Sequence, residues 1–202
     1  MSTLAVNQIT TQTGDTITLP TGKKIVVTDE GGVAAPGMIV NVKQSVDTAA
    51  YSTTGNGGVW TNIGNMSVSI TPKSASNKIL VMIDAKISHT ADSTVARGRL
   101  IRETGGVTTA PYVGDTAGNR PRSSTAQYYV SSGGAGSHFV GAAVAQFLDS
   151  PNTTNQVTYR FQIGSDGASG YTVYLNRTQS DRNSSYYDSR TASSITVMEV
   201  AG

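Results

Sequence analysis

The stretch Val157-Thr-Tyr-Arg-Phe-Gln-Ile163 decides the fold, because apolar and polar side chains alternate along its whole length. A period of two places successive side chains on opposite faces of a β-strand. The segment therefore predicts a strand with one buried face and one solvated face. Residues 38–44 and 171–176 repeat the pattern, and residues 194–200 are expected to form the last strand, so we expect a protein built mainly of strands.

Residues 79–83, Ile-Leu-Val-Met-Ile, form an unbroken apolar run. Such a run is typical of a strand that is buried on both faces, and it predicts the central strand of a sheet. Turns rich in Gly, Ser, Pro and Asn separate the segments. Roughly eight to ten strands in about 165 residues, without a credible helix, predict an all-β fold, an antiparallel β-sandwich of jelly-roll type. The remaining strands are expected at residues 67–71, 95–102, 126–131 and 138–148.

The composition supports strands and excludes several classes of protein. Ser (23) and Thr (27) supply 50 of the 202 residues, and 22 more are Gly; Thr suits a pleated surface, and Gly and Ser suit turns. The formal net charge is only +2, without a cluster of Lys or Arg, so we expect no nucleic-acid partner. No apolar run approaches the roughly 20 residues of a membrane span, so we expect no membrane insertion. The absence of Cys excludes disulfides and thiol chemistry.

The N-terminal part contains an eight-residue repeat over residues 9–32. Each unit reads as a short strand and a turn, and it cannot bury its own apolar face. We interpret residues 1–36 as an attachment and trimerisation segment, joined by a Gly-rich linker to a sandwich domain of residues 37–202. The alternative is a disordered Thr-rich leader. The apolar positions that three chains would share are Ile9, Ile17, Leu19, Ile25 and Val27.

No enzymatic motif is visible, so we expect no enzyme, no cofactor and no metal site. The chain contains no Gly-x-Ser-x-Gly, no phosphate loop, no dinucleotide fingerprint and no His-Glu-x-x-His. Serines and aspartates are plentiful, so composition alone leaves a Ser/His/Asp triad open, but no local pattern supports one. His138 borders an apolar strand and is predicted to be a core or interface residue. Glu199 lies in the last expected strand, where an Arg or a strand partner is expected to hold it.

Two tyrosine pairs beside polar loops are candidates for binding a sugar. An aromatic ring can cover the apolar face of a pyranose, while Asn, Asp and Arg take its hydroxyls. We expect such a site at the end of the sandwich away from the N-terminal segment, within residues 104–125, 128–138 and 176–190. In the alternative interpretation the tyrosines are core or interface residues, with one ring of each pair inward and one outward. The candidate glycan-binding residues are Tyr128, Tyr129, Arg177, Asp181, Arg182, Tyr186, Tyr187 and Arg190.

The opening Ser2-Thr-Leu-Ala-Val-Asn-Gln-Ile9, with the repeat punctuated by Thr-Gly pairs, resembles the N-termini of virion fibre proteins from tailed bacteriophages, notably marine ones. The rest of the chain is similar to a module common in the same phages. Together these stretches cover most of the chain, and they mark strands and turns rather than an activity. The segments that carry the second likeness are residues 37–44, 68–74, 76–81, 149–154 and 194–201.

The resemblance implies a trimeric fibre or knob on a phage particle, with a tumour-necrosis-factor-like jelly roll at its tip. We therefore expect a virion structural protein made in the host bacterial cytoplasm. The favoured role is a short tail fibre that binds a receptor on the host surface, a glycan, while residues 1–36 join it to other virion proteins. The alternative is a capsid decoration protein, a head fibre or cement protein, without a ligand.

Overall fold

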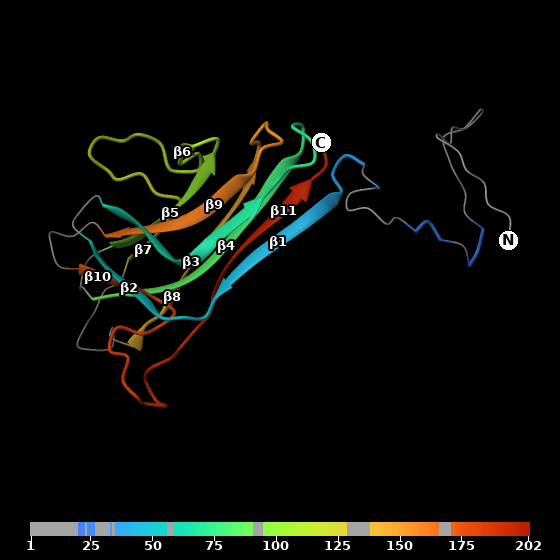
Figure 1. The fold of residues 1–202 in the computed structure, drawn as a ribbon. Coiled ribbons are helices and arrows are strands. Elements are labelled where there is room, and N and C mark those ends of the chain that lie inside the picture. Colours follow the sequence, from blue (N-terminus) through green and yellow to red (C-terminus); the bar gives the residue numbers. More distant parts are fainter. Residues whose placement is uncertain are drawn as a thin grey trace.

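Two antiparallel β-sheets pack face to face in this protein (Figure 1). Eleven strands and no helix are present in the part of the chain that the structure describes, which confirms the predicted all-β sandwich. The structure is a computed structural model, and it describes residues 20–22, 24–26, 33, 35–55, 59–90, 95–128, 138–165 and 171–202.

The first sheet, sheet A, consists of six strands: β1 (Ile39–Asp47), β2 (Tyr51–Gly55), β4 (Lys78–His89), β8 (Gly141–Asp149), β10 (Tyr171–Leu175) and β11 (Ser193–Val200). Its order is β1-β11-β4-β10-β2, and β8 pairs with β4. Strand β4 is therefore the central strand, as its apolar run predicted.

The second sheet, sheet B, consists of five strands: β3 (Trp60–Ile70), β5 (Val95–Thr104), β6 (Val107–Thr109), β7 (Thr125–Tyr128) and β9 (Val157–Ser165). Its order is β3-β9-β5-β6, and β7 pairs with β5. The core lies between the two sheets and is filled by alternate side chains of β3, β4, β5, β8, β9, β10 and β11. Residues at alternate positions of β9, from Val157 to Ile163, are at most 1% exposed, as the alternation predicted.

Close packing of the core depends on a glycine in β5. A Cβ atom on Gly98 would lie 2.1 Å from Cζ of Phe161, far inside van der Waals contact. The Phe161 ring is completely buried, and it occupies the space that the missing side chain leaves. A substitution at Gly98 would therefore displace the ring from the centre of the core.

Strand β2 and the first half of β3 were not predicted. Strand β2 reads Tyr-Ser-Thr-Thr-Gly and contains no aliphatic side chain. In β3 the register against β9 shifts between Asn62 and Ser67, which interrupts the period of two. Gly64 lies within this shift with a φ of 49°, and a Cβ there would overlap the buried carboxylate of Asp47.

The prediction that residues 79–83 are buried on both faces is wrong for the single chain. Ile79, Val81 and Ile83 point into the core and are at most 2% exposed. Leu80 and Met82 point to the other face of sheet A and are only half-buried, because no part of the described chain packs over them. The inward-facing residues of the run therefore belong to the sandwich core, and the outward-facing residues are left partly exposed to solvent.

A carboxylate is buried between the sheets at the end of β8. Asp149 is 2% exposed and accepts hydrogen bonds from the hydroxyls of Tyr159 (2.6 Å) and Tyr112 (2.9 Å). The Arg102 guanidinium contacts both carboxylate oxygens, at 2.8 and 3.0 Å. Burial, reinforced by the Asp149 carboxylate, raises the pKa of Tyr112 to about 12 and also raises the pKa of Tyr159. The buried charge is stable here because several donors surround it.

The chain enters sheet A beside the end of β11. The Gly37 amide donates to the carbonyl of Ala201 and the Ala201 amide donates to the carbonyl of Met38, each at 2.8 Å. Strand β11 then leads away from this point to Ser193 at its other end. Residues 177–192, which join β10 to β11, consequently lie at the opposite end of sheet A (Figure 1).

Replacing Tyr159 with Phe should destabilise the sandwich, because Asp149 loses one of its hydrogen-bond donors while remaining buried. We expect a loss of about 1–3 kcal/mol in the free energy of unfolding, measured as a lower urea midpoint at unchanged slope. The exposed Tyr186→Phe substitution is the control and should leave the midpoint in place. An unchanged midpoint for Tyr159→Phe would show that the hydroxyl contributes no net stability.

The same substitution should alter the alkaline limb of the stability profile. Tyr159 has a raised pKa in the folded state, so its contribution is fully present below the ordinary tyrosine value of 10.0 and is lost as the pH rises above it. Between pH 10 and 12 the wild-type free energy of unfolding should therefore fall more steeply than that of Tyr159→Phe. Parallel curves would contradict this coupling.

Candidate functional site

The loop of residues 177–192 is held at its base by one buried side chain. Asn176 is fully buried and adopts a left-handed conformation, with a φ of 60°, which asparagine tolerates better than most residues. Its side-chain amide donates to the carbonyls of Asp47 (2.7 Å) and Ala49 (3.0 Å), and its oxygen accepts from the Ser193 hydroxyl (2.6 Å). Both ends of the loop are thereby fixed to sheet A.

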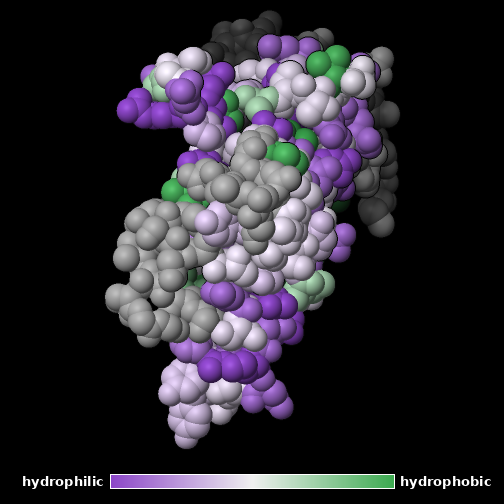
Figure 2. Space-filling model, turned by 90° about the vertical axis from the view of Figure 1, so that its left-hand side faces the viewer, coloured by the Kyte–Doolittle hydropathy of each residue, from purple (hydrophilic) through white to green (hydrophobic). Residues whose placement is uncertain are grey.

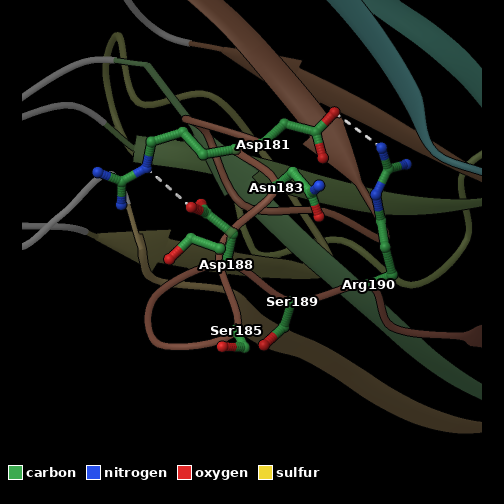
Figure 3. A pocket seen from close by; sticks show the side chains of 8 residues that line it. Asp181, Asn183, Ser185, Asp188, Ser189 and Arg190 are labelled. Atoms are coloured by element: carbon green, nitrogen blue, oxygen red, sulfur yellow. Dashed lines mark hydrogen bonds and ion pairs between the residues drawn. The ribbon is translucent and has the colours of Figure 1, made fainter.

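One carboxylate in the loop binds two arginines. Oδ2 of Asp181 lies 3.2 Å from Nη1 of Arg177 and 2.8 Å from Nη2 of Arg190, the latter pair drawn as a dashed line in Figure 3. Arg177 and Arg190 also form a backbone bridge, so the two sides of the loop approach each other. The Arg177 guanidinium lies 4.2 Å from the ring centroid of Tyr174, which restricts it further.

A second carboxylate, that of Asp188, holds the tip of the loop. It accepts from the buried Thr178 hydroxyl at 2.5 Å and from Nε of Arg182 at 2.9 Å. The Thr178 hydrogen bond, together with Arg182, lowers the pKa of Asp188. Nη2 of Arg182 also donates to Nδ1 of His138 at 2.7 Å. The same nitrogen lies 3.3 Å from Nε2 of this ring.

The two tyrosines of the loop both face solvent, with 89% of Tyr186 and 58% of Tyr187 exposed. The expectation of one inward and one outward ring is wrong for this pair. The His138 ring stacks on Tyr187 with centroids 4.8 Å apart, and the Arg182 guanidinium lies 5.3 Å from the same ring. Contacts with the protein therefore already engage the Tyr187 ring, while Tyr186 remains open for a ligand.

A polar hollow of about 400 Å³ lies within this loop (Figure 3). Carboxylate, amide, hydroxyl and guanidinium groups surround it. The lower tip of the molecule in Figure 2, which is this loop by its place in Figure 1, is correspondingly hydrophilic. Such a lining suits a ligand with many hydroxyl groups better than an apolar one. Residues around the hollow include Asp181, Asn183, Ser185, Ser189 and Arg190.

Six of the eight candidate glycan-binding residues belong to this loop: Arg177, Asp181, Arg182, Tyr186, Tyr187 and Arg190. Of these, Asp181, Arg182 and Arg190 line the hollow. The other two belong to a different segment. The backbone of Tyr128 ends strand β7 and pairs with Val95, and Tyr129 lies outside the described residues.

The candidate trimerisation residues are described at only one position. Ile25 is 64% exposed in the single chain. The other four, Ile9, Ile17, Leu19 and Val27, lie outside the described residues. The shared apolar axis and the division at residue 36 both stay predictions.

Three residues that organise the loop lie within the expected segments 128–138 and 176–190 but were not among the candidate binding residues: Asn176, Thr178 and His138. Asn176 could have been noticed as an asparagine between a strand and a polar loop, a position that favours left-handed backbone. His138 was expected to be a core or interface residue, yet it contacts Arg182, 44 residues along the chain. No local pattern reveals a contact over that separation.

The structure corrects one further expectation and narrows another. Tyr112, within the segment 104–125, bonds to the carbonyl of Leu148 and to Asp149, near the end of sheet A where the chain enters. That part of the segment therefore does not belong to the site at the opposite end. Glu199 is held from the side of its strand partner β4 and not by an arginine: it accepts hydrogen bonds from the side chain of Asn77, just before β4, and from the Lys73 amide, both at 2.6 Å.

Within the described ranges, no group of three or more His, Asp or Glu side chains is placed to hold a metal ion. No helix in that part of the chain is long and apolar enough to cross a membrane.

No protein-family model and no curated protein matches this sequence. Two solved structures that match its fold are one of the Gx strain of infectious bursal disease virus and one of T=1 particles derived from infectious bursal virus. The first is 11% identical with a TM-score of 0.42, over 89% of this chain and 36% of that chain. The second is 8% identical with a TM-score of 0.42, over 88% of this chain and 44% of that chain. This chain therefore spans less than half the length of either matched chain.

Replacing Thr178 with Val should raise the pKa of Asp188 toward its ordinary value of 3.8, because the largest stabilising contact of the carboxylate is removed. Carboxyl NMR titration measures the change directly. Thr108→Val, at an exposed position in β6, is the matched control. An unmoved Asp188 titration would show that the hydroxyl does not stabilise the charge.

The lowered pKa of Asp188 also determines how the stability of the wild-type loop changes with pH. Since the folded-state pKa of Asp188 is lowered, its contribution to stability is present above pH 3.8 and is lost as the pH falls from there through the folded-state value. Limited proteolysis within the loop should consequently accelerate below pH 3.8 in the wild type. The acceleration should be smaller in Thr178→Val.

Proposed function

We propose that this protein is a structural component of a bacteriophage particle, a short homotrimeric tail fibre whose loop 177–192 binds a glycan on the host surface. Residues 1–36 join the trimer to other virion proteins, and the three chains share the apolar positions of the repeat. The observation that carries the proposal is the placement of the polar loop at the end of sheet A opposite the point where the chain enters it.

The placement suits a receptor-binding tip. The chain enters at Met38, beside Ala201, and the loop 177–192 ends next to Ser193, at the other end of the eight-residue strand β11. At about 3.3 Å per residue the two points are separated by roughly 25 Å. If the N-terminal segment is anchored in a particle, the loop is the part of the sandwich that first meets a cell.

The chemistry of the loop suits a carbohydrate. The open ring of Tyr186 offers a surface for the apolar face of a sugar, and the hydroxyl and amide groups of the hollow can bond to its hydroxyls. Ion pairs to Asp181 and Asp188 hold the arginines in fixed positions before a ligand arrives. A shallow, hydrated site of this kind binds weakly by itself, and several copies on a trimer and on a particle supply avidity.

A capsid decoration protein without a ligand is the second candidate. The observation that favours it is the internal pairing of the loop, in which Arg177, Arg182 and Arg190 all bind carboxylates of the same loop. A network that satisfies itself can serve as a rigid surface feature. The two candidates differ in what happens when an exposed ring is removed.

Removing the Tyr186 ring should weaken attachment without weakening the fold, because the ring is 89% exposed. For Tyr186→Ala we expect binding of the isolated protein to host surface polysaccharide to fall about tenfold, equivalent to about 1.4 kcal/mol. Adsorption of particles that carry the variant should fall further, because the losses multiply over the sites engaged. Thermal unfolding should be unchanged.

Tyr186→Phe keeps the ring and serves as the matched control, with expected near-normal adsorption. Wild-type adsorption by Tyr186→Ala particles, together with antibody labelling over the head, would contradict the fibre proposal and support the decoration protein.

A further inference from the structure

The outer face of sheet A carries a row of apolar side chains across four strands. Val42 in β1 pairs with Met198 in β11, Met198 pairs with Leu80 in β4, and Leu80 pairs with Leu148 in β8. Directly paired residues project to the same face, so the four side chains form one continuous row. Val42 is 52% exposed and Leu148 is 49% exposed, and the two central residues are half-buried.

Neighbouring rows extend the apolar surface. Met82 in β4 pairs with Thr196 on one side and with Gln146 on the other. One step further along the strands, Val46 and Val144 are 54% and 53% exposed at the two edges of the face. The face therefore contains mostly aliphatic, hydroxyl and amide side chains.

The outer face of sheet B can be compared with that of sheet A in the same chain. Polar and charged side chains on it form hydrogen bonds and an ion pair. Asn62, Gln162 and Arg99 form a row across three strands that is joined by hydrogen bonds of 3.0 and 2.8 Å. Next to it Arg160 pairs with Glu103 at 3.0 Å. A sandwich that acts alone needs a solvated outer face of this kind on both sheets. Among the described residues, only the inner face of sheet A is covered by another part of the chain.

The sequence of strand β4 also indicates that the outer face of sheet A is covered. An unbroken apolar run such as residues 79–83 is typical of a strand covered on both sides. The sandwich core covers Ile79, Val81 and Ile83, whereas no described part of this chain covers Leu80 and Met82. A second surface that covered Leu80 and Met82 would remove their apolar side chains from water.

We propose that the outer face of sheet A, formed by β1, β11, β4 and β8, is the surface through which copies of this chain associate. The inference rests on the proposed homotrimer and assigns its subunit interface. Each copy places this face toward the shared axis, with the loop 177–192 left free at one end.

The charges of the face fit a second copy. Lys78, Asp84 and Lys86 are the charged side chains of β4 on this face, and Lys86 forms an ion pair with Asp84. The face is therefore almost neutral and offers nothing for a polyanion or a strongly charged protein to match. The amides of Gln44 and Gln146 contain both donors and acceptors, so the same surface on another copy can satisfy them.

Symmetry strengthens this match. About a threefold axis that runs along the strands, equivalent rows of the three copies lie at the same height. The row of Val42 and Leu148 then meets the same row of its neighbours, and the Gln44 row meets another glutamine row. The apolar row therefore packs against apolar rows, and the row with the glutamines packs against rows with glutamines.

The size of the face also fits a subunit contact. Four strands at about 4.8 Å spacing and about nine residues at about 3.3 Å each give a projected surface of roughly 19 by 30 Å, or about 570 Å². A stable interface of standard size buries about 800 Å² of accessible surface per partner. A rough surface has more accessible area than its projection, so this face is close to what each partner contributes to one contact of standard size.

The test is the oligomeric state of the full chain with charges placed in the apolar row. Light scattering coupled to size exclusion, at about 50 µM protein, should report three chains of 21.0 kDa for the wild type. The double variant Leu80→Lys/Leu148→Lys should elute as one chain with an unchanged β-sheet circular dichroism spectrum. The matched control, Ser69→Lys/Thr158→Lys on the outer face of sheet B, should remain trimeric.

The outcomes separate this inference from the proposed trimer. A trimeric double variant overturns the assignment of the face and leaves the trimer standing. A dimeric wild type that the double variant converts to a monomer overturns the trimer and keeps the face. A monomeric wild type overturns both.

A second measurement covers the case in which the double variant fails to fold. The chain contains no Cys, so Val144→Cys introduces a single attachment site for a nitroxide spin label at the edge of the face. Its spectrum should show an immobilised label with dipolar broadening from neighbouring copies, whereas Ser69→Cys on sheet B should show a mobile, unbroadened label. Identical mobile spectra from the two sites would overturn the assignment.

Discussion

Strand β11 is bonded on both sides, to β1 and to β4, and this double pairing places every functional feature of the molecule. One end of β11 receives the incoming chain at Ala201. The other end begins at Ser193, whose hydroxyl bonds to Asn176 and closes the base of the loop. Between them, Met198 contributes to the outer apolar row. A central strand cannot slide by one residue without exchanging its buried and exposed sides, so these three positions are fixed relative to one another.

Two kinds of carboxylate show how the same chemistry serves different ends of the sandwich. Asp149 is buried, and phenol and guanidinium donors surround it, so that it ties the two sheets together. Asp181 and Asp188 lie in the loop and hold arginines near solvent. Removing a donor from the first kind weakens the fold, because the charge stays buried. Removing a donor from the second kind loosens a local surface, where water can replace it.

Most of the fold could be predicted from the sequence, because alternation is a local signal. The buried side of β9, from Val157 to Ile163, follows it directly. The signal failed at β3, where Gly64 adopts a positive φ inside a register shift and the period of two is broken. It also failed for β2, which contains only one large side chain, Tyr51. These strands form because their neighbours offer free backbone groups, which the local sequence does not encode.

The candidate site was predictable in composition and not in geometry. Polar residues with adjacent tyrosines marked the loop, but the contact of Arg182 with His138 and the anchoring of Asn176 by Asp47 join segments far apart in the sequence. Which tyrosine ring stays open depends on those contacts, since His138 stacks on Tyr187 and leaves Tyr186 exposed.

The failed expectation about residues 79–83 is the most informative, because the run indicated a strand covered on both faces and the described part of the chain covers only one. An apolar row left in water lowers solubility, and solvated sheet faces such as that of sheet B show that this sequence can build the alternative. A shared axis against sheet A would resolve the contradiction and would also hold three copies of loop 177–192 at the same end. Weak sites held at fixed spacing bind a repetitive surface far more tightly than separate sites do. Covering the apolar face and presenting the polar loop in multiple copies would then be two consequences of a single packing arrangement.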